Sequence, residues 1–238
     1  MSEPTYRRVV LKLSGEALSG EEPFGVDQPT IDRYAADLVA ARALGVTLGV
    51  VVGGGNILRG VEISQKGVSR PTGDAMGMLA TVMNALVLEA ALERAGAPAR
   101  AMSALAMPQV CETFERQRAL RHLDDGTIVI FAGGTGNPFF TTDTAAALRA
   151  SEMGCDALLK GTKVDGVYSA DPKLDATAVK YDQITYMEIL GKGLKVMDLT
   201  AVSLCKDNDL PMVIFNMNQP GNIKRVVMGE KVGSLVTA

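Results

Sequence analysis

Short runs of apolar residues alternate along the chain with longer segments in which apolar residues recur at helical spacing. The short runs predict buried strands at residues 9–13, 46–52, 127–132, 156–160, 212–216 and 231–237. The longer segments predict a helix that Asp27 and Pro29 begin and Gly45 ends, and further helices at 74–94, 113–123, 141–153, 198–207 and 221–228. Strands that alternate with helices in this way predict an α/β fold with a largely parallel central sheet. No repeat or linker divides the chain, so we expect residues 1–238 to form a single domain.

The balance of charge argues against nucleic acid or an anionic membrane as a partner. The 238 residues include 24 basic and 27 acidic side chains, for a net charge of -3. A chain of this charge offers no basic surface for nucleic acid or for an anionic membrane. No segment contains the roughly 18 unbroken apolar residues that cross a bilayer, and the polar N-terminus is unlike a secretory signal.

Cysteine and histidine usage narrows the chemistry further. Cys111, Cys155 and Cys205 are widely spaced and odd in number, which is typical of reduced thiols in a cytoplasmic protein. His122 is the only histidine, so histidine triads and histidine-rich metal sites are nearly excluded.

Glycine-rich or polar loops follow several of the predicted strands directly, at Ser14-Gly15 and at residues 53–56, 133–137 and 160–165. Ligands of open α/β sheets bind at the carboxyl ends of the strands, so we expect these loops to converge on one polyanionic ligand. No GxxxxGK[ST] motif is present, and no GxGxxG opens a helix after the first strand, which excludes a P-loop and disfavours a Rossmann site. Lys12 lies inside the first strand, where a phosphate would compensate the cost of burying it. The alternatives are that the glycines only form tight turns and that Lys12 is a surface charge on an edge strand.

Ordered segments along nearly the whole chain carry a family resemblance. They are KLSGEAL at 12–18, GGGN at 53–56, RG at 59–60, residues 74–83, TGNPFFTTD at 135–143, residues 160–171, KVMD at 195–198, FNMN at 215–218 and VMGE at 227–230. In these segments the chain resembles the bacterial UMP kinases of the amino acid kinase superfamily. Residues 135–142 are the most specific, since they distinguish UMP kinases from the amino-acid and carbamate kinases. The resemblance implies the three-layer α/β sandwich of the amino acid kinase fold, and transfer of the γ-phosphoryl of ATP to UMP to give UDP in pyrimidine nucleotide biosynthesis.

The resemblance also implies a role for each matching residue. The candidate catalytic residues are Lys12, Asp143, Lys160 and Asp198, with Asp143 positioning the two lysines. The ATP-binding residues would be Lys12, Leu13, Ser14, Gly15, Gly55 and Arg59 at the phosphates, and Thr162, Tyr168 and Asp171 at the adenosine. The UMP-binding residues would be Gly54, Asp74, Thr135, Gly136, Asn137, Pro138, Phe139, Phe140, Thr141 and Thr142. The alternatives are structural ion pairs for Asp143, Lys160 and Asp198, and ordinary core packing for Phe139 and Phe140.

Cofactor, effectors and assembly are further implications of the resemblance. Mg²⁺ would accompany ATP and be held mainly by the nucleotide phosphates, with no metal ligand supplied by the protein. GTP would activate through Gly20, Glu21, Glu22, Pro23, Phe24 and Gly25. UTP would inhibit, and the subunits would form a homohexamer. Met76, Met78, Leu79 and Met83 fit either plain core or a subunit contact on the long helix.

Two other functions stay open at this point. One is a related kinase that acts on a carboxylate or carbamate substrate. The other is a nucleotide-binding regulator without catalysis, against which the presence of both Lys12 and Asp143 argues. In a UMP kinase the acceptor phosphate is largely dianionic at neutral pH, so it needs no general base, in keeping with a single histidine.

Overall fold

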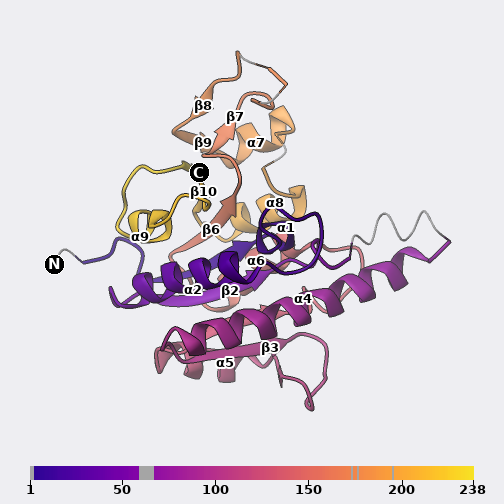
Figure 1. Cartoon of the computed structure of the whole chain (residues 1–238). Coiled ribbons are helices and arrows are strands. Elements are labelled where there is room, and N and C mark those ends of the chain that lie inside the picture. Colours follow the sequence, from indigo (N-terminus) through magenta and orange to yellow (C-terminus); the bar gives the residue numbers. More distant parts are fainter. Residues whose placement is uncertain (1–2, 59–66, 173, 176, 195) are drawn as a thin grey trace.

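A central sheet organises the molecule in the computed structural model, which describes residues 3–58, 67–172, 174–175, 177–194 and 196–238 (Figure 1). In this part of the chain the sheet has nine strands in the order β4-β3-β5-β2-β1-β6-β10-β11-β9. Across the sheet these are Glu112–Thr113, Ala99–Ser103, Ile128–Ala132, Thr47–Val52, Arg8–Leu13, Ala157–Thr162, Met212–Asn216, Ser234–Thr237 and Gln183–Thr185. Within this sheet only the described pair of β10 and β11 is antiparallel, which confirms the predicted largely parallel α/β sheet.

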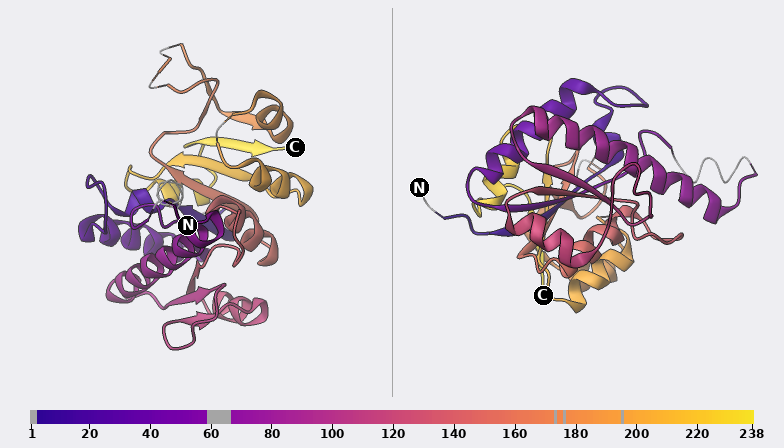
Figure 2. Two further views of the ribbon diagram at one scale, coloured as in Figure 1. Left: turned by 90° about the vertical axis from the view of Figure 1, so that its right-hand side faces the viewer. Right: turned by 90° about the horizontal axis from the view of Figure 1, so that it is seen from below.

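Helices cover both faces of this sheet and complete a three-layer sandwich (Figure 2). On one face lie α2 (Gln28–Arg42), α4 (Arg70–Arg94), α9 (Asn222–Val227) and the short α1 (Gly15–Leu18). On the other lie α5 (Arg116–Asp124), α6 (Thr142–Glu152), α7 (Tyr186–Lys192) and α8 (Leu199–Asp207). The predicted three-layer arrangement is therefore confirmed.

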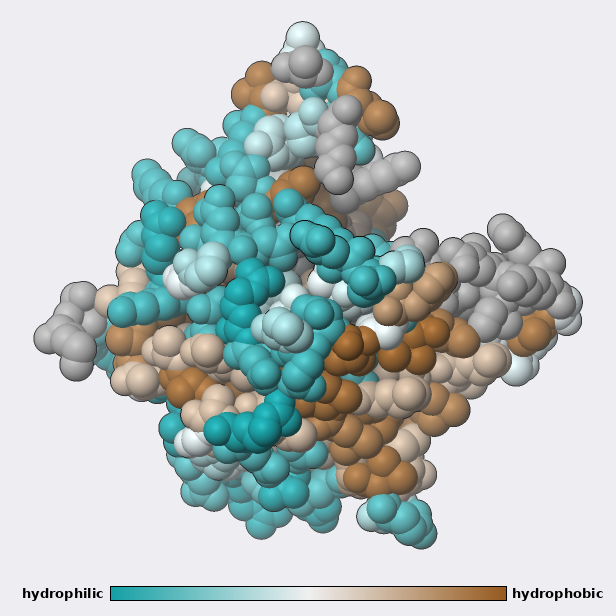
Figure 3. Space-filling view, in the orientation of Figure 1, coloured by the Kyte–Doolittle hydropathy of each residue, from teal (hydrophilic) through white to brown (hydrophobic). Residues whose placement is uncertain are grey.

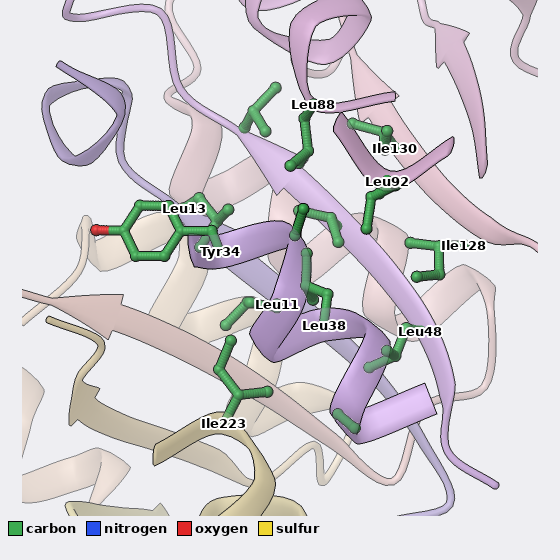
Figure 4. Packing of buried hydrophobic residues seen from close by; sticks show 14 of the residues in the cluster. Leu11, Leu13, Tyr34, Leu38, Leu48, Leu88, Leu92, Ile128, Ile130 and Ile223 are labelled. Atoms are coloured by element: carbon green, nitrogen blue, oxygen red, sulfur yellow. The ribbon is translucent and has the colours of Figure 1, made fainter. Parts of the chain in front are cut away.

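The alternation of side chains along β1 divides the core into two clusters. Leu11 and Leu13 point toward α2, where Tyr34 and Leu38 lie, and Leu88 of α4 belongs to the same cluster (Figure 4). Val10 belongs to the opposite cluster, beneath α6 and α8. Successive residues of a strand face opposite sides, so Lys12 shares the face of Val10.

A small ribbon stands beyond the sheet, at the top of Figure 1. Its strands are β7 (Val167–Tyr168) and β8 (Lys180–Tyr181), which pair antiparallel. The Val167 amide donates to Ser234 Oγ on β11 over 2.8 Å, and this bond ties the ribbon to the sheet. The sequence pattern predicts only a polar loop over residues 161–172.

Several element boundaries differ from the sequence prediction for identifiable reasons. The helix predicted at 113–123 begins at Arg116, because the Glu115 carboxylate caps it by accepting from the amides of Gln117 and Arg118. The helix predicted from residue 74 begins at Arg70, because Ser69 caps it and a proline follows at its first turn. Strand β3 and helix α7 were not predicted, since neither segment shows a clear apolar period.

Helix α4 is the one described helix long and apolar enough to cross a membrane by length and composition. However, 44% of its most apolar window is buried inside the molecule. Met76, Leu79 and Met83 form an exposed apolar strip along it. The space-filling view shows brown, hydrophobic surface on the side of the molecule where α4 runs (Figure 3). Thus α4 is a core helix with one uncovered apolar side.

The predicted cap of α2 provides a test of this local structure. The Asp27 carboxylate accepts a hydrogen bond from the Thr30 amide over 2.9 Å. We expect Asp27→Ala to lower the free energy of unfolding by about 1 kcal/mol, and Asp27→Asn to lower it much less because an amide oxygen still caps. Urea denaturation of both variants measures this. Equal losses in the two would mean that Asp27 acts through its charge rather than as a cap.

Candidate active site

Two lysines and one aspartate meet at the carboxyl ends of the central strands. Lys12 on β1 is directly opposite Lys160 on the neighbouring β6. Asp143, in the first turn of α6, lies 2.8 Å from Lys12 Nζ through Oδ1 and 2.7 Å from Lys160 Nζ through Oδ2. One carboxylate thus bridges two ammonium groups, and the cluster carries a net positive charge. Its side chains are only 9%, 13% and 14% exposed for Lys12, Lys160 and Asp143.

Burial and charge act against each other in this cluster. Burial alone would raise the pKa of the Asp143 carboxyl, but the charges of Lys12 and Lys160 lower that pKa below its ordinary value. Burial lowers the pKa of Lys160, and the charge of Lys12 lowers it further, although Asp143 opposes both. The Lys160 ammonium also donates to the Val196 carbonyl over 2.6 Å. An incoming anion would therefore favour the charged form of Lys160.

Asp198 lies behind the cluster, between the N-termini of two helices. It caps α8 by accepting from the Ala201 amide over 2.8 Å. It also accepts from the Thr144 hydroxyl over 2.9 Å and from the Thr141 hydroxyl at the start of α6. Negative charge at a helix N-terminus is favourable, so Asp198 joins the starts of α6 and α8 and thereby places Asp143. Direct participation of Asp198 in catalysis stays a prediction.

The first two glycine-bearing loops lie against each other beside Lys12. A Cβ at Gly15 would lie 2.5 Å from the Gly55 amide nitrogen, and one at Gly54 would lie 2.8 Å from the Gly77 carbonyl oxygen of α4. Only glycine permits these approaches. The structure thus brings Leu13, Ser14, Gly15, Gly54 and Gly55 together at one edge of the sheet. Arg59, predicted with them, falls outside the described residues.

A cleft of about 700 Å³ opens from the cluster toward the β7–β8 ribbon. Lys160 lies in its wall, together with Thr162, Tyr168 and Asp171, the three residues predicted for adenosine. The Tyr168 hydroxyl donates to Asp165 Oδ1 over 2.6 Å, and the Thr162 hydroxyl donates to the Val164 carbonyl over 2.6 Å. The cleft is large enough for a nucleoside and ends at the charged cluster.

The loop that connects β5 to α6 holds the residues predicted for UMP. It contains Thr135, Gly136, Asn137, Pro138, Phe139, Phe140 and Thr141, and Thr142 begins α6. The Phe139 amide donates to Asp74 Oδ2 on α4 over 2.8 Å. Phe139 is 64% and Phe140 51% exposed, which rules out core packing for both aromatic rings. Asp74 and this loop therefore form one surface. Both rings are exposed on it, and the Arg70 guanidinium carbon lies 5.9 Å from the centroid of the Phe139 ring.

Several supporting residues were missed by the sequence analysis. Arg70 Nε lies 2.9 Å from each oxygen of Asp74, and Thr81 Oγ1 accepts from the Gly133 amide over 2.7 Å. Asn84 is fully buried in the apolar helix α4. A polar side chain within an apolar helical stripe is a signal for such residues, because its burial requires a partner.

No group of three or more His, Cys, Asp or Glu side chains that could hold a metal occurs among the described residues. The two ammonium groups already share the one carboxylate at the centre of the site. Two ammonium groups and one carboxylate do not suit a cation held by the protein alone. They suit an anion, which the ammonium groups can bind.

A mostly parallel α/β sandwich with a Lys-Asp-Lys cluster at its strand ends defines a phosphate-handling enzyme class. The chain belongs to the amino acid kinase family, whose model matches residues 7–216. Within it, the chain is 58% identical over 238 residues to the uridylate kinase of Nitrobacter hamburgensis, with 100% of both chains covered. Two solved structures are also similar. The UMP kinase of Bacillus anthracis has a TM-score of 0.95 and 38% identity, covering 98% of this chain and 96% of that one. The UMP kinase of Ureaplasma parvum has a TM-score of 0.93 and 33% identity, with 100% of both chains covered.

The cluster has two cations and one anion, so we expect loss of the anion to lower the free energy of unfolding more than loss of one cation. Asp143→Asn leaves two adjacent buried cations uncompensated, so we expect a loss of about 3–5 kcal/mol in the free energy of unfolding. Lys12→Met leaves Asp143 paired with Lys160, and we expect a clearly smaller loss. Urea denaturation at neutral pH compares the two variants. Equal losses would show that the charge balance does not control the stability of the cluster.

Proposed function

We propose that the chain transfers the γ-phosphoryl of ATP to the phosphate of UMP, giving ADP and UDP for pyrimidine nucleotide synthesis. The observation that carries this proposal is the Lys12–Asp143–Lys160 cluster, which joins the nucleoside-sized cleft to the phosphate-binding loops. The kinship with uridylate kinases over the full chain supports UMP as the acceptor.

The proposed reaction follows from the charges at the cluster. An oxygen of the UMP phosphate forms a bond to the γ-phosphorus as the bond to the ADP oxygen breaks, and ADP leaves. Phosphoryl transfer passes through a loose transition state, so the protein acts mainly by positioning and by stabilising charge. Lys12 and Lys160 would face that charge, and Asp143 would hold both ammonium groups in place. The acceptor is already an anion, so no side chain has to remove a proton from it.

The two nucleotides are assigned to opposite sides of the cluster. Adenosine would occupy the cleft at Thr162, Tyr168 and Asp171, and UMP would lie on the 135–142 loop. Asp74 would accept hydrogen bonds from the ribose hydroxyls of UMP. Exposed Phe139 and Phe140 offer apolar surface to uracil.

Mg²⁺ is proposed to arrive with ATP rather than to reside on the protein, in keeping with the donor set of the cluster. When bound, it would neutralise part of the charge on the ATP phosphate oxygens. The residues of this chain would bind and orient the nucleotide phosphates.

Self-association is proposed to occur through the exposed apolar strip of Met76, Leu79 and Met83 on α4. A continuous apolar strip beside the site is typical of an interaction surface. A homohexamer is the assembly that kinship with UMP kinases favours.

The continuous nine-stranded sheet supports one domain over residues 1–238.

Regulation by GTP and UTP is also proposed. A cavity of about 740 Å³ borders Gly20, Glu21, Glu22 and Pro23 and includes Arg33 and Lys163, two cations that a triphosphate could approach. Gly25 is bonded to the loop at Asn56, which offers a route from this segment to the phosphates. UTP shares uracil and ribose with UMP and would compete for the same residues.

Free thiols at Cys111, Cys155 and Cys205 favour a cytoplasmic location.

A panel of acceptors tests the function directly. We expect ATP-dependent release of ADP with UMP, and at least about tenfold less with CMP, acetylglutamate, aspartate or carbamate. A coupled ADP assay with purified protein and Mg²⁺ measures each rate. Faster turnover of a carboxylate or carbamate would overturn the choice of UMP, and tight nucleotide binding without turnover would indicate a regulator.

The lowered pKa of Lys160 predicts the basic limb of the activity profile. Activity should be full while Lys160 is protonated and should fall as pH rises through its pKa, below the ordinary lysine value of about 10.4. Lys160→Arg keeps its charge at any accessible pH, so its basic limb should move upward even if the variant is slower. Measurement of kcat/KM against pH tests this, with Lys206→Arg on the exposed side of α8 as the control. An unmoved limb in Lys160→Arg would assign the titration to another group.

A further inference from the structure

A pair of buried asparagines joins α4 to the phosphate-binding loop. Asn56 and Asn84 are both 0% exposed. Asn56 Nδ2 donates to Asn84 Oδ1 over 3.1 Å, and Asn84 Nδ2 donates to Asn56 Oδ1 over 2.7 Å. Each side-chain amide therefore donates one hydrogen bond to the other and accepts one from it.

The remaining amide hydrogens bind the main chain on either side. Asn84 Nδ2 donates to the Gly53 carbonyl over 2.7 Å, and Asn56 Nδ2 donates to the Gly25 carbonyl over 2.7 Å. The Gly25 amide returns a bond to the Asn56 carbonyl over 2.8 Å. Three segments, α4, the loop at 53–56 and the chain at Gly25, are thus tied to one pair of side chains.

This arrangement fixes geometry more than it adds stability. Each asparagine amide has two donors, and all four are used in this pair. Hydrocarbon side chains of similar volume would fill the same space without any polar group to desolvate. A fully satisfied buried network specifies one arrangement, because any other leaves a donor or acceptor unpaired at a cost.

The loop held in this way is the one beside Lys12. Its Gly54 lies against α4 at Gly77 and Ala80, so the loop cannot move independently of the helix. Among the described residues, no main-chain carbonyl pairs with the amides of Gly54 and Gly55. Main-chain amides that no main-chain carbonyl uses are suited to binding an anion.

We propose that Asn84 is a positioning residue for phosphoryl transfer, which acts through Asn56 to hold the 53–56 loop in its phosphate-binding conformation. The expected change in kcat rests on the proposed function, whereas the expected change in the Kd for MgATP does not. Asn84 lies on α4, which covers the face of the sheet opposite to the Lys12 side chain, and it need not touch a nucleotide.

The test compares substitutions at Asn84 with a control one turn further along α4. Asn84→Ala removes the amide, and Asn84→Asp keeps its volume but places carboxylate oxygens against the Gly53 carbonyl. We expect each variant to lower kcat at saturating ATP and UMP by at least tenfold and to raise the Kd for MgATP at least fivefold. Leu88 is equally buried and contacts only the core, so Leu88→Ala should leave kcat and Kd within twofold while its Tm falls.

The outcomes separate a positioning role from a purely structural one. All variants are assayed at a temperature at which circular dichroism shows them folded, and Asn84→Ser, which retains one donor, replaces Asn84→Ala if the latter does not fold. Unchanged kcat and Kd in the folded asparagine variants would overturn the proposal, as would equal losses in Leu88→Ala. If the wild type binds MgATP but does not phosphorylate UMP, the proposed function fails, and Asn84 is then judged on the MgATP Kd alone.

Discussion

The structure of the site depends on the attraction between one carboxylate and two ammonium groups. Parallel pairing of β1 with β6 places Lys12 and Lys160 opposite each other, where they would repel. Asp143 makes that arrangement stable, and it must approach from α6. The start of α6 is in turn fixed by Thr141 at its cap and by Asp198 from α8. The placement of a layer of helices thus follows from the need to neutralise two lysines at the end of a sheet.

Asp143 neutralises only one of the two ammonium charges, so the cluster keeps a net positive charge. This remaining charge would attract a bound anion. Transfer between two phosphates gathers negative charge at one point, and water there would have to reorient at each turnover. Fixed ammonium groups and main-chain amides need no such reorientation. The same burial lowers the pKa of Lys160, and an anion bound beside it would favour the charged form of the ammonium group.

The sequence predicts the strands that bear Lys12 and Lys160, the caps at Asp27 and Thr141, and the loops that follow the strands. Each of these depends on local patterns within about ten residues. It does not predict that β1 and β6 are neighbours, since they are separated by most of the chain and strand order depends on three-dimensional packing. Thr81 and Asn84 are missed for a similar reason. Both look like members of an apolar helical stripe until the loops that they hold lie against α4.

The pairing of Lys12 with Lys160 has a consequence for how this chain tolerates change in length. Side chains alternate between the two faces of a strand, so one residue added or removed within β1 ahead of Lys12 would turn its ammonium into the hydrocarbon cluster of α2 and α4. The same holds for β6 and Lys160. Variation in length among related chains should therefore accumulate in the connecting segments, such as the one that leads to the β7–β8 ribbon, while the two strands keep a constant residue count.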